Sequence, residues 1–469
     1  MISRTLRAFI LIYSARVLGA DSFGIFSLGI SLAAVFTILS DMGINAVLVK
    51  EGVKSDDTRH RHFASAFLVK FPLLAIFSVI SAIIAFIYAN RIPEVIPTLP
   101  FIIAVFAFDS LRDLIGSLAR SLDRMDLDAK GQVVTNIAIV AFALAALKLS
   151  PSALSLIAGY SAGTFLGLTL MIVALRKEFV GILSGYSWSL MKEMIRSAWP
   201  FGLVSLMGVV AINTDALIIG LVRDAASVGL YSAVIRPTQF LYIIPAALAS
   251  AVFPSLAKIS GNKNKDEFRG IFKAAINSGY LFAFPLAIGG FITADKMMNL
   301  LYGPEYAPAI ASFAVLSLTF LFVFPSLFIT NALFARNLKG KTFVIYSLIG
   351  IFGNALLDVA LIRVWGITGS AIATLIIQGI LFLYGAQKLR EDMNISVVSD
   401  VWKIALSASA MGVVAFVLSA LNTHLLVIIA ISGIVYLSLL MALAEPTLRF
   451  ISRPLLRKIG LAPEWQGEQ

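Results

Sequence analysis

The chain contains no cysteine among its 469 residues. It therefore cannot form disulfide bonds, cysteine-ligated zinc sites or iron–sulfur clusters. Charged residues are also sparse, at 13%, whereas 59% of the residues are hydrophobic and the mean hydropathy is +0.92. An average soluble chain carries about twice that share of charge. The composition therefore excludes an ordinary soluble enzyme and indicates an integral membrane protein.

Motifs for nucleotide hydrolysis and metal binding are missing as well. The sequence has no G-x-x-x-x-G-K-[ST] phosphate loop, so the chain does not hydrolyse ATP by itself. Its three histidines, His60, His62 and His424, fall in loops or at the edges of apolar stretches. We therefore expect no metal site, no cofactor and no catalytic residues.

Long apolar stretches alternate with short connectors along the whole chain. Crossing the hydrocarbon core of a bilayer takes about 20 mostly apolar residues, so the pattern predicts an all-α integral membrane protein with about 14 transmembrane helices. The predicted spans are 5–18, 23–40, 63–89, 95–119, 130–148, 152–175, 199–221, 228–257, 271–293, 309–334, 342–362, 367–386, 400–420 and 424–444.

The positive charge of the connectors has a strong bias. Of the 37 lysines and arginines, about 28 fall in every second connector or in the two termini. The alternate connectors carry only Arg91, Lys148, Arg223, Lys296 and Arg363. Cytoplasmic loops are the basic ones, so we expect a multi-pass protein of the cell membrane with both termini in the cytoplasm. The net charge of +11 then reflects topology and anionic lipid, not a nucleic-acid partner.

Two short motifs occur twice, in the same order. Gly24-Ile25-Phe26-Ser27 is matched by Gly229-Leu230-Tyr231-Ser232, and residues 93–97 (PEVIP) are matched by 304–308 (PEYAP). Offsets of about 205 and 211 residues indicate a duplicated six-helix unit. Since six is even, the copies are parallel, and we predict two six-helix lobes around a central cleft, followed by two C-terminal helices.

The connectors suggest boundaries for these parts. Residues 1–183 form the first lobe and 199–391 the second, with a basic amphipathic linker helix at 184–198 lying in the membrane interface. The last two spans occupy 399–445, and 446–469 is a basic cytoplasmic tail in which 448–459 is again expected at the interface.

Four stretches carry a family resemblance: residues 15–27 (ARVLGADSFGIFS), 215–232, 301–306 (LYGPEY) and 361–374 (LIRVWGITGSAIAT). Together they resemble the polysaccharide-export flippases (Wzx-type) of the MOP superfamily, relatives of the MATE transporters and of the lipid II flippases. The resemblance implies a MATE-like fold that moves an oligosaccharide linked to undecaprenyl or dolichyl diphosphate from the cytoplasmic to the outer leaflet by alternating access. It also implies a polysaccharide polymerase and glycosyltransferases as partners.

The first span departs from that family pattern. Only about 14 residues form a helix before Arg16, and at 1.5 Å per residue they cover about 21 Å, less than the hydrocarbon core of about 30 Å. We therefore expect that the first helix is shortened and that the true N-terminus precedes Met1. At Asp358, such flippases often carry asparagine instead.

The fourth predicted span holds the clearest set of intramembrane charges. Asp109, Arg112 and Asp113 share one helix face with Gly116 and Arg120. A charged face does not point to lipid. One interpretation is a cleft lining that contacts sugar hydroxyls and diphosphate, and the other is a self-neutralised ion-pair cluster that holds helices together.

Two further cations are candidates for substrate contact. Arg236 lies in the eighth span, where Gln239 shares its face, and a guanidinium supplies the fork of donors that a diphosphate accepts. An ion pair with Asp215 is the alternative for Arg236. Lys70 in the third span either contacts substrate or extends to the cytoplasmic interface.

Isolated acids in the seventh and eleventh spans are candidates for ion coupling. Asp358 has Asn354 one turn before it on the same face, and Asp215 stands alone in its span. Either acid can carry a proton or help to hold Na⁺ that drives transport, and a hydrogen-bonded structural acid is the alternative. Pro237, Pro245 and Pro254 predict a kinked eighth span.

Rival functions remain open within transport and outside it. A lipid II flippase and a MATE-type multidrug or cation antiporter have the same architecture, although an antiporter cleft should be less cationic. A membrane glycosyltransferase, ligase or O-acyltransferase needs catalytic acids or a histidine facing a sizeable reaction site, and the short outer loops leave little room for one.

Overall fold

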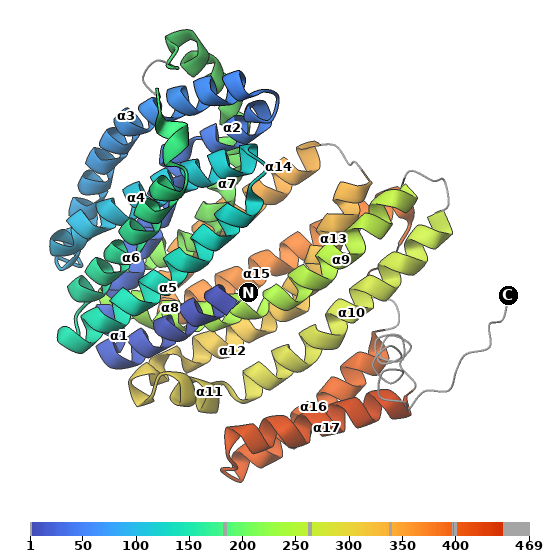
Figure 1. Cartoon of the computed structure of the whole chain (residues 1–469). Coiled ribbons are helices and arrows are strands. Elements are labelled where there is room, and N and C mark those ends of the chain that lie inside the picture. Colours follow the sequence, from blue (N-terminus) through green and yellow to red (C-terminus); the bar gives the residue numbers. More distant parts are fainter. Residues whose placement is uncertain are drawn as a thin grey trace, which may run out of the picture. The chain divides into compact units, whose positions relative to one another are not determined.

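The computed structural model describes residues 2–181, 185–260, 265–336, 340–395, 397 and 401–443, and the side chains from residue 9 onward except that of residue 260. Every regular element in these ranges is a helix (Figure 1). The elements are α1 (Ile2–Asp41), α2 (Ile44–Gly52), α3 (Asp56–Ala89), α4 (Val95–Ser121), α5 (Met125–Leu149), α6 (Ala153–Ala174), α7 (Trp188–Val222), α8 (Ala225–Leu241), α9 (Ile243–Ser260), α10 (Lys265–Ile292), α11 (Ala294–Leu301), α12 (Ile310–Leu318), α13 (Phe320–Ala335), α14 (Gly340–Leu348), α15 (Asn354–Met393), α16 (Trp402–Ala420) and α17 (Leu425–Ala442), with short helices at Arg176–Phe179 and Pro304–Ala309 and a π-turn at Ile349–Gly353.

The predicted membrane spans are confirmed. Within the described residues, 12 helical segments are long and apolar enough to cross a bilayer. Two of these segments each contain two predicted spans, because the chain reverses at a glycine with positive φ: Gly19 (φ 72°) in α1 and Gly366 (φ 58°) in α15. Glycine adopts these values without the penalty that a Cβ brings. The all-α fold with about 14 crossings therefore matches the sequence prediction.

Proline breaks the eighth span, as expected. α8 ends at Leu241 and α9 begins at Ile243, and Pro245 cannot donate the backbone hydrogen bond that would reach the carbonyl of Leu241. The eleventh span is interrupted by the π-turn Ile349–Gly353, directly before Asn354. Such turns often occur at functional sites.

The chain divides by its contacts into two compact units. The first comprises residues 1–233, 301–306 and 354–370, and the second comprises 234–300, 307–353 and 371–469. This division differs from the lobes that the sequence suggested, because parts of the second repeat (α7, the start of α8, the loop 301–306 and residues 354–370) pack with the first repeat.

The first unit is a bundle in which α4 lies among α1, α3, α5 and α6. One buried apolar cluster of this unit contains Leu48 of α2, Phe63 of α3, Leu114 and Leu118 of α4 and Met194 of α7. α7 also packs on α1 and α3, and Tyr88 of α3 donates a hydrogen bond of 2.9 Å to the carbonyl of Leu217 in α7.

The second unit is built around α10, which packs against α9, α13 and α16. Phe268 and Phe272 of α10, Phe328 of α13 and Ile404 of α16 belong to one buried apolar cluster. α16 and α17 form a C-terminal hairpin (Figure 1). The hydroxyl of Tyr436 in α17 donates a 2.8 Å hydrogen bond to the carbonyl of Leu281 in α10 and so fixes the hairpin to this unit.

The predicted linker helix is not a separate element. Trp188 begins α7, a helix of 35 residues that continues through Pro200 to Val222. At 1.5 Å per residue it is about 52 Å long, enough to cross the bilayer and extend beyond it. Trp188 is 58% exposed and Trp199 is 60% exposed, and the ammonium of Lys192 lies 5.3 Å from the centre of the Trp188 ring. The predicted interfacial stretch 448–459 and the tail 446–469 lie outside the described residues.

Candidate functional site

Charged residues of α4 form an ion-pair group inside a helix of membrane-span length. The Arg112 guanidinium lies 2.8 Å from the carboxylate of Asp113 and 3.5 Å from that of Asp109. The Arg112 side chain is 13% exposed and Asp113 is 34% exposed. The structure therefore brings together the three residues that the helix-face argument grouped, and one arginine is shared by two carboxylates.

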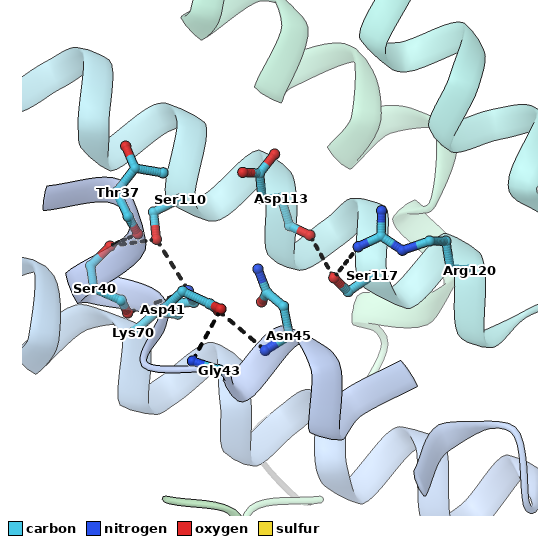
Figure 2. Close-up of polar contacts among 10 residues, drawn as sticks. All are labelled: Thr37, Ser40, Asp41, Gly43, Asn45, Lys70, Ser110, Asp113, Ser117 and Arg120. Atoms are coloured by element: carbon cyan, nitrogen blue, oxygen red, sulfur yellow. Dashed lines mark hydrogen bonds and ion pairs between the residues drawn. The ribbon is translucent and has the colours of Figure 1, made fainter. Parts of the chain in front are cut away.

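A second pair continues this polar face toward the end of α4. Arg120 binds Asp128 of α5 at 2.6 Å. Arg120 also donates to the hydroxyl of Ser117 at 2.7 Å, and Ser117 donates to the carbonyl of Asp113 (Figure 2). Gly116 allows this arrangement, because a Cβ built there would lie 2.6 Å from an oxygen of Asp128. The face thus connects α4 to α5 through charge-assisted hydrogen bonds.

Lys70 is fully buried beside this face. Its ammonium donates to Asp41 at 3.0 Å, to the hydroxyl of Ser110 at 3.1 Å and to the carbonyl of Ser40 at 3.4 Å (Figure 2). An ammonium has three protons, and these three partners accept all of them. Lys70 therefore does not extend to the cytoplasmic interface, which was one of the two interpretations of the sequence.

Asp41 links Lys70 to the turn that follows the second span. Its two carboxylate oxygens accept from the backbone amides of Gly43 and Asn45, both at 3.2 Å, at the start of α2 (Figure 2). Met42 (φ 47°) and Gly43 (φ 85°) turn the chain between α1 and α2. Gly43 packs tightly on α7, since a Cβ there would lie 2.3 Å from the carbonyl oxygen of Ala198. Sequence reasoning missed Asp41, although an acid directly before Met42-Gly43 at the end of a span was a usable signal.

The ion-coupling candidates also meet in the first unit. Asn354 donates 2.6 Å and 3.1 Å hydrogen bonds to Asp215 and Asp358, respectively. The Tyr231 hydroxyl donates a short hydrogen bond to the other oxygen of Asp215. Asp358 is fully buried, and Asp215 and Asn354 are each 8% exposed. Two carboxylates from α7 and α15 thus share one amide.

Two polar atoms near this acid pair remain unsatisfied by hydrogen bonds among the described residues: Oδ1 of Asp358 and Oγ of Ser370. Two buried carboxylates close together do not both stay ionised without a counter-charge. Such a pair can therefore bind a proton or a cation. Sequence reasoning did not select Tyr231 and Ser370, although both lie within the motifs 229–232 and 361–374.

Arg236 and Gln239 lie on the second part of α8, beyond the boundary between the two units, and both are partly buried. Arg112 and Arg236 belong to different units. No group of three or more His, Asp or Glu side chains suited to a metal ion occurs in the part of the chain that the structure describes.

The chain is similar to proteins of a known family. Residues 1–260 match the family described as "Polysaccharide biosynthesis protein". A "Probable low-salt glycan biosynthesis flippase Agl15" of Haloferax volcanii is 25% identical over 375 residues, which cover 77% of this chain and 75% of the relative.

Solved structures share the fold at lower identity. The lipid II flippase MurJ in an inward closed conformation superposes with a TM-score of 0.74 at 17% identity, covering 97% of this chain and 99% of MurJ. An inward-facing MATE family multidrug transporter of the MOP superfamily gives 0.69 at 12% identity, covering 84% and 94%.

Proposed function

Since the chain belongs to the polysaccharide biosynthesis protein family, as its motifs predicted, we propose that it flips a polyprenyl-diphosphate-linked oligosaccharide from the cytoplasmic to the outer leaflet by alternating access. The observation that carries the proposal is the charged face of Asp109, Arg112 and Asp113 within a span-length helix. A charged face in hydrocarbon is costly, and it is retained where it serves a polar cargo. The similarity to the Agl15 flippase supports the same function.

The charge of each candidate suggests a division of labour. Arg112 is already shared by Asp109 and Asp113, so this group has one more negative than positive charge and repels a diphosphate unless the pairing changes. The carboxylates can accept hydrogen bonds from sugar hydroxyls, and the guanidinium can donate hydrogen bonds to them. We therefore assign the sugar part to the α4 face and the diphosphate to Arg236, with Gln239 on the same helix face. Lys70 has its donors occupied and acts as a positioning residue for Asp41.

Transport is coupled to an ion at Asp215, Asn354 and Asp358. The carboxylates of Asp215 and Asp358 and the amide oxygen of Asn354 can supply the oxygen ligands that a hard cation such as Na⁺ takes, and the same carboxylates accept a proton. Ligands that bind the folded state raise its stability according to their concentration. Replacing choline by Na⁺ should therefore raise the melting temperature of the wild type and not that of Asp358→Asn. A proton site predicts instead a pH-dependent transport rate that Asp358→Asn makes flat. If neither Na⁺ nor pH acts through Asp358, the acid pair is structural.

The location and partners follow from this function. The chain is a multi-pass membrane protein, and we place it in the cell membrane with both termini in the cytoplasm, where a polysaccharide polymerase and glycosyltransferases work on the same lipid-linked glycan. It acts as a transporter without catalytic residues. A lipid II flippase is the second candidate, because MurJ shares the fold over nearly the whole chain.

Export of the surface glycan tests the function. Arg236→Ala should abolish export while the protein stays at its normal level in the membrane, and Arg236→Lys should restore only part of it, because an ammonium lacks the planar fork of donors. Arg363→Ala, which removes an exposed cation from an outer turn, is the matched control and should export normally. Normal export by Arg236→Ala would contradict the assignment of the diphosphate.

A further inference from the structure

Two glycines from the two sequence repeats bring their helices into backbone contact. A Cβ built on Gly24 would lie 1.8 Å from the carbonyl oxygen of Ala225, and a Cβ built on Gly229 would lie 1.8 Å from the carbonyl oxygen of Ala20. The contact is reciprocal, and each helix presents small residues four positions apart, Ala20 with Gly24 and Ala225 with Gly229. Small residues at this spacing let membrane helices approach closely.

The two glycines are also equivalent in the internal repeat. Gly24 opens the motif at 24–27 and Gly229 opens its copy at 229–232. When equivalent residues contact each other reciprocally, they lie on the axis that relates the copies. The charge pattern assigns this crossing to the outer side, so the first and second repeats meet at the outer end of the axis without any side chain between them.

The loop 301–306 secures the same place. The reversal at Gly19 displaces the amide of Ala20 from the position in which it would donate to residue 16 of a continuous helix. Tyr306, fully buried, donates to the Ala15 carbonyl at 2.9 Å, and the Glu305 carboxylate accepts from the Ala20 amide at 2.8 Å. Two neighbouring residues, Glu305 and Tyr306, thus bind the backbone of α1 on both sides of Gly19. A carboxylate is favourable at the N-terminus of the helical segment that begins at Ala20.

The helix turn of the second repeat lacks the corresponding contact, although the first repeat carries the equivalent glutamate. Glu94 occupies in the motif 93–97 the place that Glu305 occupies in 304–308. Glu94 is exposed, and no hydrogen bond joins it to α8 among the described residues. Asp224 instead caps its own helix, accepting from the amide of Ser227 at 2.8 Å. The loop contact is therefore one-sided, and Glu94 is a natural control for Glu305.

We propose that Glu305, with the crossing of Gly24 and Gly229, forms the outer gate, and that the bonds of Glu305 to Ala20 and of Tyr306 to Ala15 break each time the cleft opens outward. The proposal rests on the proposed flippase function. Glu305 then controls the equilibrium between the closed and the open gate. Since the acceptor of this bond is the charged carboxylate of Glu305, losing the bond should shift the gate toward the open form.

Accessibility of a thiol behind the gate tests this without any substrate. Ser27 lies one turn inside Gly24 and is 1% exposed, and Ser27→Cys is a conservative change in a chain with no other cysteine. In this background Glu305→Ala should raise labelling by an impermeant thiol reagent from outside roughly tenfold, as expected for a lost charge-assisted bond. Glu305→Gln, which keeps an acceptor, should raise it less, and Glu94→Ala should leave it unchanged. Equal labelling in Glu305→Ala and Glu94→Ala would overturn the proposal.

A second experiment holds the gate closed with a cross-link. Asp21 and Asp224 are exposed and lie close enough for their charges to interact. The double variant Asp21→Cys with Asp224→Cys, joined by a short reducible bifunctional thiol reagent, should lose outside labelling of a third cysteine at Ser27 and lose export, and a reductant should restore both. The two single variants are the controls. If the cross-link abolishes labelling while the uncross-linked protein exports no glycan, the gate stands and the flippase function fails. Continued export through the cross-linked protein would refute the gate itself.

Discussion

The ammonium of Lys70 lies 3.0 Å from the carboxylate of Asp41, and no part of the lysine side chain reaches the surface. The pair connects α3 to the turn that follows the second span, because Asp41 also accepts hydrogen bonds from the backbone amides of Gly43 and Asn45. A buried charge is tolerated only when it is paired and hydrogen-bonded. The pair therefore fixes the turn at Met42 and Gly43, on which α7 packs.

Removing one partner of this pair should be severe. Lys70→Met leaves Asp41 uncompensated, and breaking a buried pair costs about 3–5 kcal/mol. The double variant Lys70→Met with Asp41→Asn should recover part of that loss. Lys54→Met, which removes an exposed pair with Glu51, is the control and should cost about 0–1 kcal/mol. Thermal unfolding in detergent measures all three, and a Lys70→Met variant as stable as Lys54→Met would contradict the pairing.

The glycine crossing predicts opposite effects of the same substitution at different sites. Gly24→Ala and Gly229→Ala each force a methyl group against a backbone carbonyl, so both should lower the melting temperature. Gly208→Ala in α7 meets no atom within 4 Å and should be neutral or stabilising by about 0.5–1 kcal/mol, the usual gain of alanine in a helix. Similar losses at all three positions would show that the crossing is not special.

Asp21, two residues after the reversal of α1 at Gly19, predicts a small pH effect. Burial, and then the charges of Glu94 and Asp224, raise the pKa of Asp21 above its ordinary value of 3.8. Ionisation of such a carboxyl destabilises the folded state as the pH rises through 3.8 to the raised pKa. Asp21→Asn should therefore be slightly more stable than the wild type near pH 7, and the difference should vanish below 3.8. Asp57→Asn, at an exposed position, is the control. If Asp21→Asn gained more stability over the wild type at acidic pH than near pH 7, the predicted sign of the effect would be wrong.

Membrane orientation predicts which single cysteines react from outside. Leu149, 88% exposed, ends α5 on the side assigned to the exterior, and Asp57 lies in the first turn of α3 on the basic side, which is assigned to the cytoplasm. Leu149→Cys should react with an impermeant maleimide on intact cells, whereas Asp57→Cys should react only after lysis. The reverse pattern would invert the topology.

Much of the architecture was predictable because it depends on local sequence. Hydropathy gives the spans, since each must cross about 30 Å of hydrocarbon. Prolines explain the break between α8 and α9, and the recurrence of residues 24–27 at 229–232 anticipated two repeats. Helix periodicity placed Asp109, Arg112 and Asp113 on one face, because residues three and four apart are neighbours on a helix.

The partners of the charged residues were decided by tertiary structure alone. Asp215 and Asn354 are 139 positions apart, and Glu305 and Ala20 are 285 apart. Hydropathy and periodicity describe one helix at a time, whereas these bonds depend on how helices from both repeats pack. For the same reason the sequence offered two readings of Lys70, and only the packing of α1, α3 and α4 buried its ammonium against Asp41 and Ser110. The sequence by itself determined which segments cross the membrane and which polar residues they carry, and the packing determined which of those residues neutralise one another, because the absence of water in hydrocarbon leaves them no other partner.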